Sequence, residues 1–299
     1  MLRKIAILTG GPSQEHDIAV ASAQSVQQAI ETKAVTTIFI FPEQIDEYLS
    51  HRTQFECVIP VFHGRGGEDG SIQGFLETLQ MPYVFSSVTT HALAIDKVKT
   101  NSLIGQTGIS VPENIVVHAH GQAVWKDTVV VKPLDSGSSI GVTIAHDQKE
   151  LDLAIQQALK ISNRVLVEEY VAGQEFSVAV IDVDGKTEAL PVISIEPKHD
   201  FFDFESKYQE GLAVETCPAD ISGELATRLQ QAAVKVHQVI GAKHVSRSDF
   251  IVDAKGTIWF LEVNTIPGMS VLLPKAIAAS GRDFGEVIMG WVESVMQKS

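Results

Sequence analysis

Two segments near the end of the chain, Val245–Asp253 and Thr257–Asn264, alternate polar and apolar residues around a short turn, which is the pattern of a β-hairpin. If Asp253 pairs with Ile258, the two-residue period of strands brings four polar side chains to one face: Arg247, Asp249, Glu262 and Asn264. In that register Arg247 lies opposite Asn264, and Asp249 lies opposite Glu262. Carboxylate and amide oxygens are ligands that Mg²⁺ prefers, so the hairpin predicts a metal site.

The paired acids are the reason to prefer a metal over a plain surface. A solvated strand face with paired charges is the common alternative, but two carboxylates directly opposite each other repel. A hard cation held by their oxygens removes that repulsion. On the other face of the hairpin, four apolar side chains are expected in the core: Phe250, Val252, Trp259 and Leu261.

A lysine and a loop of small residues follow an apolar strand in the middle of the chain. Lys132 closes the run Val129–Val131, and the loop Asp135–Gly141 would let backbone N–H groups approach an anion such as phosphate. The loop is not a P-loop, because no GxxxxGK[ST] motif occurs in the chain. An ordinary hairpin is the alternative interpretation of this loop.

Other polar residues have plainer interpretations when they are taken alone. Three acids at a strand exit are expected to be solvated: Glu168, Glu169 and Glu175. Asp182–Gly185 indicates a hairpin turn and not a calcium loop, since the twelfth position of such a loop is Ile193. His237 is expected to be solvated on a helix, and Cys57 to be a core residue of a strand and not a nucleophile.

The elements that must position these residues begin with strands alternating with helices. Apolar runs predict strands at 4–9, 36–41, 57–62 and 82–85, with helices after Ser13, as N-cap, and over 72–79. This alternation indicates a parallel sheet that binds ligands at the carboxyl ends of its strands, where two glycine-rich loops lie. From Asp96 the pattern changes to a small α+β domain spanning roughly 96–180, and the remainder carries long strands and a helix over 224–240.

Length and composition set the outer bounds. The chain has 299 residues, 44% hydrophobic and 20% charged, with a net charge of −14 that argues against nucleic acid or an anionic membrane as partner. Its two cysteines, Cys57 and Cys217, fit a reducing compartment. No apolar run approaches the roughly 18 residues of a membrane span, and the first one is too short for a signal peptide. We therefore expect a cytoplasmic enzyme.

Taken in order, these segments resemble the D-alanine–D-alanine ligases of the ATP-grasp superfamily over nearly the whole chain. Seven motifs carry the resemblance: Gly10-Gly-Pro-Ser-Gln-Glu15-His16, His63-Gly-Arg-Gly-Gly-Glu-Asp-Gly70, Asp96-Lys97, Lys132-Pro with Gly137-Ser138-Ser-Ile-Gly141, Phe204-Glu-Ser-Lys207-Tyr208, Arg247-Ser-Asp249, and Glu262-Val-Asn264-Thr-Ile-Pro-Gly268-Met269. Any one of them is weak alone, but their shared order is specific.

The resemblance implies an α/β fold of three domains with an α+β central part. These would be a Rossmann-like parallel sheet over 1–95, a central ATP-grasp subdomain over 96–180 and a C-terminal catalytic domain over 181–299, with ATP between the last two. The implied reaction serves peptidoglycan precursor synthesis. One D-alanine takes the γ-phosphate of ATP to give an acyl phosphate, and the amine of a second D-alanine displaces phosphate. A homodimer is also implied.

The resemblance further implies a role for each matched residue. The phosphates of ATP would meet three lysines and the phosphate loop: Lys97, Lys132, Lys207 and Ser138. Its adenine and ribose would contact the end of one strand and the start of the next: Glu168, Glu169, Tyr170, Val171 and Glu175. Two Mg²⁺ ions, or Mn²⁺ in their place, would bridge the β- and γ-phosphates from three ligands: Asp249, Glu262 and Asn264.

The amino-acid substrates have their own implied contacts. Glu15 would anchor the ammonium of the first D-alanine in a hydrogen-bonded set with Ser138 and Tyr208. His63 would lie near the carboxylate of that substrate. Arg247 and the N–H of Gly268 would hold the developing oxyanion.

One departure concerns the second substrate. The family usually has a few more residues between Pro-Gly-Met and the next proline, including a serine for the carboxylate of the second substrate. This chain runs from Pro267 to Pro274 with a shorter loop and a valine near the expected serine. Ser270 or Lys275 could take over that role, and we expect Ser270 to do so.

Two alternatives remain open from the sequence. One is an ATP-grasp ligase that joins D-alanine to another acceptor, such as D-serine or D-lactate, although Lys207-Tyr208 favours a dipeptide product. The other is a nucleotide-binding relative without ligase activity, against which the intact Arg247, Glu262 and Asn264 argue.

Overall fold

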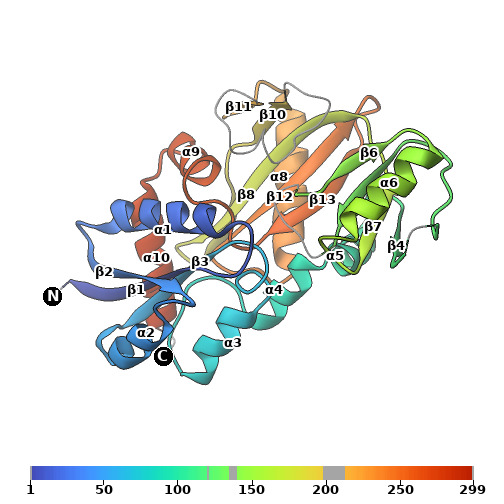
Figure 1. Cartoon of the computed structure of the whole chain (residues 1–299). Helices are drawn as coiled ribbons and strands as arrows, with labels where there is room; N and C mark the ends of the chain where they lie inside the picture. The colour runs from blue at the N-terminus through green and yellow to red at the C-terminus, as the bar shows by residue number, and fades with distance from the viewer. Residues whose placement is uncertain (1, 120, 135–139, 198–212, 298–299) are drawn as a thin grey trace.

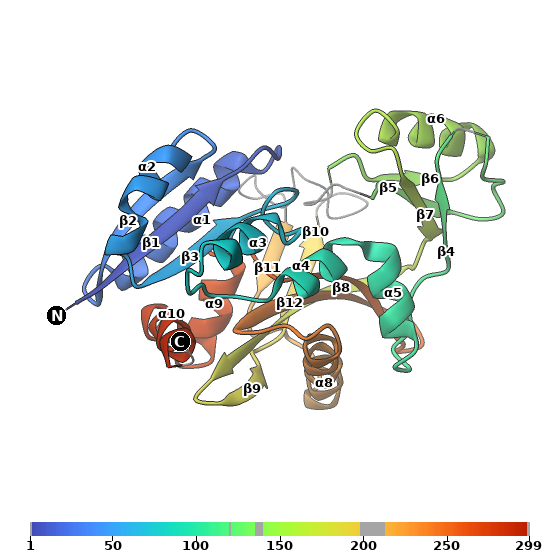
Figure 2. The same ribbon diagram turned by 90° about the horizontal axis from the view of Figure 1, so that it is seen from below.

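The computed structural model describes residues 2–119, 121–134, 140–197 and 213–297. Three β-sheets follow one another across the molecule: a blue parallel sheet, a long central sheet and a green four-stranded lobe (Figure 1). A view from below shows that the lobe stands apart from the first sheet, with α4 and α5 between them (Figure 2).

The first sheet is parallel and has the order β2-β1-β3. It consists of β1 (Arg3–Gly10), β2 (Ala34–Phe41) and β3 (Cys57–Phe62), with helices α1 (His16–Ile30), α2 (Ile45–His51) and α3 (Ser71–Thr78) and a 3₁₀ turn at Arg52–Gln54. Alternate residues of β1 enter different cores. Ile5 and Ile7 pack in the cluster that contains α1, whereas Ala6 and Leu8 pack with residues of α2 and α3. Helices thus cover both faces, as near-continuous apolar strands require.

The central sheet has six antiparallel strands in the order β11-β10-β8-β12-β13, with β9 paired to β8. They are β8 (Gly173–Val183), β9 (Lys186–Ala189), β10 (Ile193–Pro197), β11 (Ala213–Thr216), β12 (Val245–Asp253) and β13 (Ile258–Asn264). The helices of this region are α4 (Val88–Ile95), α5 (Lys97–Gly105), α8 (Gly223–Val239), α9 (Leu272–Ala279) and α10 (Phe284–Met296). One core cluster joins α8 to the buried phenylalanines of β8, β12 and β13.

The four-stranded lobe has the order β4-β7-β5-β6 and is antiparallel. Its strands are β4 (Asn114–Val117), β5 (Val129–Pro133), β6 (Thr143–Ala145) and β7 (Val165–Glu169), with helix α6 (Gln148–Ala158) packed on β5 and β6. The lobe contains a hydrophobic cluster of its own. The domain limits given above stay a prediction.

Most predicted elements are present within a few residues of their expected bounds, but segment 82–85 and His237 differ from the prediction. Segment 82–85 lies beside β3 but does not form a strand. It makes only an isolated parallel bridge, between Tyr83 and Val58. His237 is buried, since Nδ1 bonds with Ser246 Oγ at 2.8 Å and Nε2 lies 3.5 Å from Asp182 Oδ1. Cys57 is fully buried in β3 as predicted, and burial raises the pKa of its thiol to about 12.

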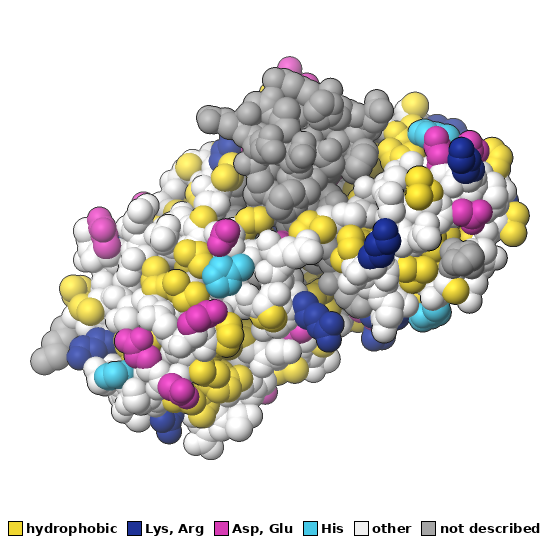
Figure 3. Space-filling model, in the orientation of Figure 1, with side chains coloured by type: hydrophobic (Ala, Val, Ile, Leu, Met, Phe, Trp, Pro, Cys, Tyr) yellow, Lys and Arg dark blue, Asp and Glu magenta, His cyan; other side chains and the backbone are white. Residues whose placement is uncertain are grey.

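On the face in Figure 3, the yellow hydrophobic groups lie between white and charged ones. Within the described part of the chain, no helix combines the length and apolar character that crossing a membrane requires.

Candidate active site

The hairpin of β12 and β13 brings its four polar side chains together as predicted. Arg247 lies opposite Asn264, and Asp249 lies opposite Glu262. The third strand, β8, places Ser177 beside Asp249 on the other side. Three adjacent strands therefore support this acidic face.

A register shift one residue after the acidic pair changes the rest of the hairpin. Phe250 pairs with Phe260, and their fully buried rings meet edge to face with centroids 6.0 Å apart. The expectation that Trp259 and Leu261 would join the core beside Phe250 is therefore wrong. Trp259 lies on the opposite face, where Nε1 donates to Asp253 Oδ2 at 3.0 Å. A bulge inserts one residue into the alternation and so exchanges the faces beyond it.

Asp249 is the most enclosed acid of the hairpin, with only 4% of its surface exposed. Ser177 Oγ donates to its Oδ1 at 2.6 Å. Arg247 approaches both carboxylate oxygens, with Nε 3.2 Å from Oδ1 and Nη2 3.1 Å from Oδ2. This two-point contact holds the guanidinium in one orientation.

Two lysines pair with two glutamates at the predicted nucleotide positions. Lys97, at the start of α5, lies 3.0 Å from Glu262 Oε2. Burial lowers the pKa of Lys97, but the neighbouring Glu262 carboxylate outweighs burial and raises that pKa above its ordinary value. Lys132 of β5 forms an ion pair with Glu168 of β7.

The end of β7 separates into a buried and an exposed part. Glu168 has only 4% of its surface exposed, so the solvated-acid interpretation is wrong for this residue. Glu169 is exposed, and 37% of Tyr170 is exposed at the strand exit. Val171 and Glu175 are half-buried on either side of the start of β8. The chain beyond Glu168 is therefore accessible to a ligand.

A small cavity of about 90 Å³ lies between the first sheet and the hairpin. It gathers six predicted site residues: Glu15, His63, Arg247, Asn264, Gly268 and Ser270. An added Cβ at Gly268 would meet nothing within 4 Å, so the space beside this cavity-lining residue is open. The cavity holds the residue types expected for a small zwitterion, with a carboxylate and a guanidinium in one space.

Glu15 reaches this cavity from the N-terminus of α1. Glu15 occupies the N-cap position itself, so the expectation that Ser13 caps the helix is wrong. Ser13 Oγ instead donates to the carbonyl of His63 at 2.7 Å and accepts from the N–H of Glu15 at 3.2 Å. Ser13 thus joins the first loop to the second.

His63 lies at the end of β3, where Ser22 Oγ is 3.1 Å from its Nε2. Burial and the nearby Arg247 lower the pKa of His63 to about 4. The imidazole is therefore neutral at pH 7, where it can exchange a hydrogen bond but adds no charge to the cavity.

Two further acids line the cavity that the sequence did not single out. Burial and the nearby Glu15 raise the pKa of Glu68 to about 8, although its Oε2 accepts from the N–H of Gly64 at 2.8 Å. Burial also raises the pKa of Glu215. Glu68 lies inside the His63–Gly70 motif and could have been noticed there, whereas no motif marks Glu215.

The two residues considered for binding the carboxylate of the second substrate, Ser270 and Lys275, have different surroundings. Ser270 is exposed and lines the cavity beside Val271, which occupies the N-cap position of α9 without a side-chain cap. Lys275 donates instead to the backbone carbonyl of Glu215. Ser270 is therefore better placed than Lys275 to meet a second substrate.

The three predicted metal ligands can be compared with what a Mg²⁺ site requires. Among the described residues, no group of three or more His, Cys, Asp or Glu side chains could hold a metal on its own. The side chains of Asp249, Glu262 and Asn264 nevertheless present carboxylate and amide oxygens from two facing strands, and these are the donors that suit Mg²⁺. These three residues fit the metal when phosphate oxygens complete the ligand set.

Three predicted residues, Ser138, Lys207 and Tyr208, lie outside the described residues.

Comparison with known proteins assigns the family. The sequence-family model described as the D-ala D-ala ligase C-terminus matches residues 104–293 of this chain. The family model described as the D-ala D-ala ligase N-terminus matches residues 42–86. A D-alanine--D-alanine ligase from Halalkalibacterium halodurans is 37% identical over 306 residues, covering 99% of this chain and all of the relative. The chain belongs to the D-alanine–D-alanine ligase family.

Solved structures agree with this family. The VanG D-Ala:D-Ser ligase from Enterococcus faecalis is 28% identical with a TM-score of 0.82, covering 98% of this chain and 99% of that one. A D-alanine--D-alanine ligase from Bacillus anthracis complexed with ATP is 25% identical with a TM-score of 0.83, and each chain is fully covered. The expected ATP-grasp fold of the D-alanine–D-alanine ligase family is confirmed.

Proposed function

We propose that the chain joins two D-alanines into D-alanyl-D-alanine at the expense of ATP. Membership of the D-alanine–D-alanine ligase family supports the reaction class. The observation that carries the proposal is the cavity that unites Glu15, Arg247 and Gly268 beside the acidic face of the hairpin. A carboxylate substrate held there lies next to the place where phosphates would be bound.

The nucleotide is proposed to bind between the four-stranded lobe and the hairpin. Lys132 and Glu168 come from the lobe, and Lys97 and Glu262 come from the other side. When the nucleotide binds, Lys132 and Lys97 would contact phosphate oxygens in place of their carboxylate partners. The strand exit over Glu169, Tyr170 and Val171 is accessible for the base, with Glu175 nearby for the ribose.

Metal ions would be held by three ligands of the hairpin: Asp249, Glu262 and Asn264. When bound, Mg²⁺ neutralises the charge that builds up between the β- and γ-phosphates. The protein positions those ligands through Ser177 and Arg247 on one side and Lys97 on the other.

The proposed chemistry is carboxylate activation. A carboxylate oxygen of the first D-alanine attacks the γ-phosphorus, giving an acyl phosphate and ADP. The deprotonated amine of the second D-alanine then attacks the carbonyl carbon, and phosphate leaves with the original carboxylate oxygen. Glu15 would hold the ammonium of the first substrate, and Arg247 with the Gly268 N–H would hold the oxyanion. Ser138 and Tyr208 are proposed to complete the hydrogen-bonded set with Glu15.

We further propose that the chain works in the cytoplasm as a homodimer, with domain limits at 1–95, 96–180 and 181–299. An acidic chain of this composition suits small-molecule substrates better than nucleic acid or a membrane.

The test is phosphate release from ATP with a panel of D-alanine, D-serine, D-lactate and L-alanine as substrates. We expect D-alanine alone to support turnover and D-alanyl-D-alanine to accumulate. Turnover only when D-serine or D-lactate accompanies D-alanine would assign a different acceptor. ATP binding without phosphate release under any condition would contradict ligase activity.

A further inference from the structure

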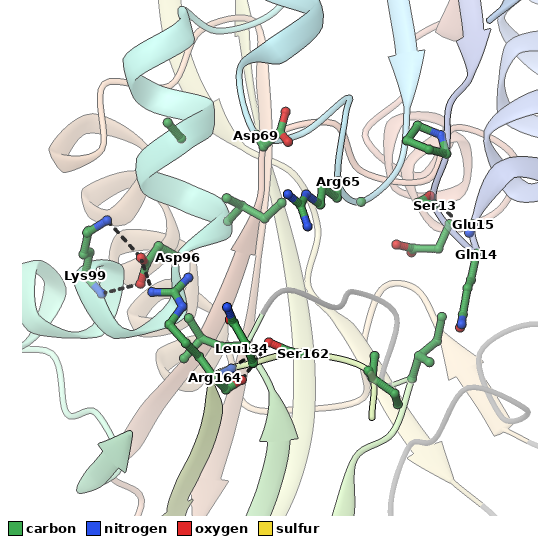
Figure 4. Close-up of a pocket in the computed structure, with 17 residues that line it drawn as sticks. Ser13, Gln14, Glu15, Arg65, Asp69, Asp96, Lys99, Leu134, Ser162 and Arg164 are labelled. Carbon is green, nitrogen blue, oxygen red and sulfur yellow. Dashed lines mark hydrogen bonds and ion pairs between the residues drawn. The ribbon is translucent and has the colours of Figure 1, made fainter. Parts of the chain in front are cut away.

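A second pocket, of about 650 Å³, lies where the first sheet, the junction of α4 with α5 and the four-stranded lobe meet (Figure 4). Asp96, Lys99 and Arg164 line one wall of it, and Ser13, Gln14 and Glu15 line the far wall. Dashed lines in Figure 4 connect Asp96 to both Lys99 and Arg164. This charged group joins residues from two bodies of the protein: the four-stranded lobe, and the part of the molecule that contains α5.

The four-stranded lobe has little apolar attachment to the rest. Its buried apolar cluster draws only on residues between 117 and 167 among those described. Two stretches of backbone connect it to neighbouring elements, from α5 into β4 and from β7 into β8. The proposed ATP site nevertheless needs Lys132 and Glu168 of the lobe to face Lys97 and Glu262 of the other body. A further contact between the lobe and the other body would fix the orientation of the lobe.

Asp96 is the residue on the other body that can provide this contact. Its Oδ1 accepts from the N–H of Lys99 at 3.2 Å, so it caps α5, and Lys97 is the first residue of that helix. Its Oδ2 lies 2.9 Å from Lys99 Nζ and 3.5 Å from an Arg164 guanidinium nitrogen. The side chain is only 7% exposed. A carboxylate this enclosed is stable as an anion only when cations or N–H groups face it.

Arg164 is firmly attached to the lobe. It directly precedes β7, and its carbonyl accepts from the N–H of Leu134 at 2.9 Å and from Ser162 Oγ at 2.8 Å. Ser162 Oγ also accepts from the N–H of Arg164 at 3.1 Å. Leu134 follows β5, two residues after Lys132. The backbone of Arg164 is thus bonded to the start of the phosphate loop, and its side chain reaches across to Asp96.

We propose that Arg164 and Asp96 are positioning residues, whose ion pair sets the lobe against α5 so that Lys132 and Lys97 face the same nucleotide. The inference rests on the proposed function only for the identity of that nucleotide. Neither residue is among those proposed to contact ATP or D-alanine. It acts through Lys97 on one side and through β5 and β7 on the other.

The expected consequence is selective for the nucleotide. Without the pair, the lobe samples more orientations, and only part of them brings both lysines to the phosphates. The apparent affinity for ATP falls in proportion to the fraction that is competent. Of the residues proposed to contact D-alanine, only Ser138 belongs to the sequence of the lobe. Glu15, Arg247 and Gly268 line a cavity between the first sheet and the hairpin, so the affinity for D-alanine falls less than that for ATP.

The experiment compares Arg164→Ala, Arg164→Lys and Asp96→Asn with Arg282→Ala as a matched control. Arg282 has the same 37% side-chain exposure as Arg164 and pairs with Glu188 away from the site. Asparagine at position 96 still accepts from the N–H of Lys99, so the helix cap is kept. Calorimetric titration with Mg-ATP gives the affinity, and steady-state kinetics gives KM for ATP and for D-alanine.

We expect Arg164→Ala and Asp96→Asn each to weaken ATP binding by about two- to fivefold, the range for an ion pair that is partly exposed to water. The double variant should be no weaker than either single variant, and Arg164→Lys should regain most of the loss. KM for D-alanine should change less than about twofold, and Arg282→Ala should behave as the wild type.

Three results would overturn the proposal: equal ATP affinity of Arg164→Ala and Arg282→Ala, additive effects in the double variant, or an equal rise in both KM values. If the wild type binds Mg-ATP but ligates no D-alanine, the proposed function fails. The ATP affinities of the variants still decide the role of the pair in that case.

Discussion

At the residue scale, each acid of the facing pair Asp249 and Glu262 has a cation of the protein beside it. Arg247 contacts Asp249 at two points, and Lys97 contacts Glu262. These cations offset the repulsion between carboxylates that face each other across two strands. They also keep both acids oriented toward the space where metal and phosphate are proposed to bind.

Glu262→Gln tests the metal ligand. Glutamine keeps the shape of the side chain but removes the charge that a shared Mg²⁺ needs, so phosphate release should fall by orders of magnitude while the fold is retained. Steady-state rates and circular dichroism check both parts. Glu188→Gln, at an exposed glutamate paired with Arg282, is the control and should keep full activity. A rate within a few-fold of wild type for Glu262→Gln would refute the assignment.

Ser270→Ala tests the shortened loop. A carboxylate entering the cavity loses its hydration, and Ser270 is the hydroxyl of that loop that lines the cavity. Its removal should raise KM for the second D-alanine by roughly 5- to 50-fold, the effect of one charge-assisted hydrogen bond, and leave KM for ATP unchanged. Ser280→Ala, at the other end of α9, is the control. An unaltered KM for the second substrate would exclude Ser270 as the donor.

Lys132→Met tests the phosphate lysine of the lobe. The side chain is only 15% exposed and pairs with Glu168, so its loss removes a positive charge from an enclosed site and leaves a buried acid behind. ATP turnover should fall by about 10- to 100-fold. Lys186, the first residue of β9, is exposed, and its change to Met should have no effect on the same assay. Similar losses at the two positions would mean that the phosphate interpretation is wrong.

At the element scale, Asp182 joins the central sheet to its helices. Its carboxylate accepts from Thr187 Oγ1 at 2.6 Å and from the N–H of His244 at 2.8 Å, and it faces His237 of α8. Its carbonyl accepts from Trp291 Nε1 of α10 at 3.0 Å. Burial opposes the charge, but His237, Thr187 and the N–H of His244 outweigh it and lower the pKa of Asp182 to about 2.

Asp182→Asn should therefore lower the free energy of unfolding by about 1–3 kcal/mol at pH 7, because one buried donor loses its acceptor. The folded-state pKa lies below the ordinary value of 3.8, so the carboxylate stabilises the fold above about pH 4. That contribution is lost as the pH falls toward 2, and wild type and variant should converge. Urea unfolding at several pH values measures this, with Asp184→Asn in the exposed turn as the control. A difference that does not depend on pH would contradict the origin of the effect.

The sequence allowed prediction of elements whose register follows from simple alternation. The acids of the hairpin could be paired because period two extends from Arg247 to Asp249 and from Glu262 to Asn264. The bulge beyond them could not be predicted, since Trp259, Phe260 and Leu261 are all apolar and none is marked as the extra residue. Side-chain partners from distant segments were also missed, as with Asp182 for His237 and Lys132 for Glu168.

At the scale of the whole molecule, the proposed site lies where three sheets meet. The first sheet contributes Glu15 and His63, the central sheet contributes Arg247, Asp249 and Glu262, and the lobe contributes Lys132. Each body has a buried core of its own, so the site depends on how the bodies are set against one another. The carboxyl ends of the parallel strands point toward this junction, as predicted from the glycine-rich loops.

The central claim is that ATP activates the carboxylate of one D-alanine for attack by the amine of another. The most direct measurement uses D-alanine labelled with ¹⁸O in both carboxylate oxygens and follows the released phosphate by mass spectrometry. We predict one ¹⁸O in each phosphate and an equal amount of D-alanyl-D-alanine, because the oxygen that attacks phosphorus leaves with it. Phosphate without label, or released without dipeptide, would contradict the account.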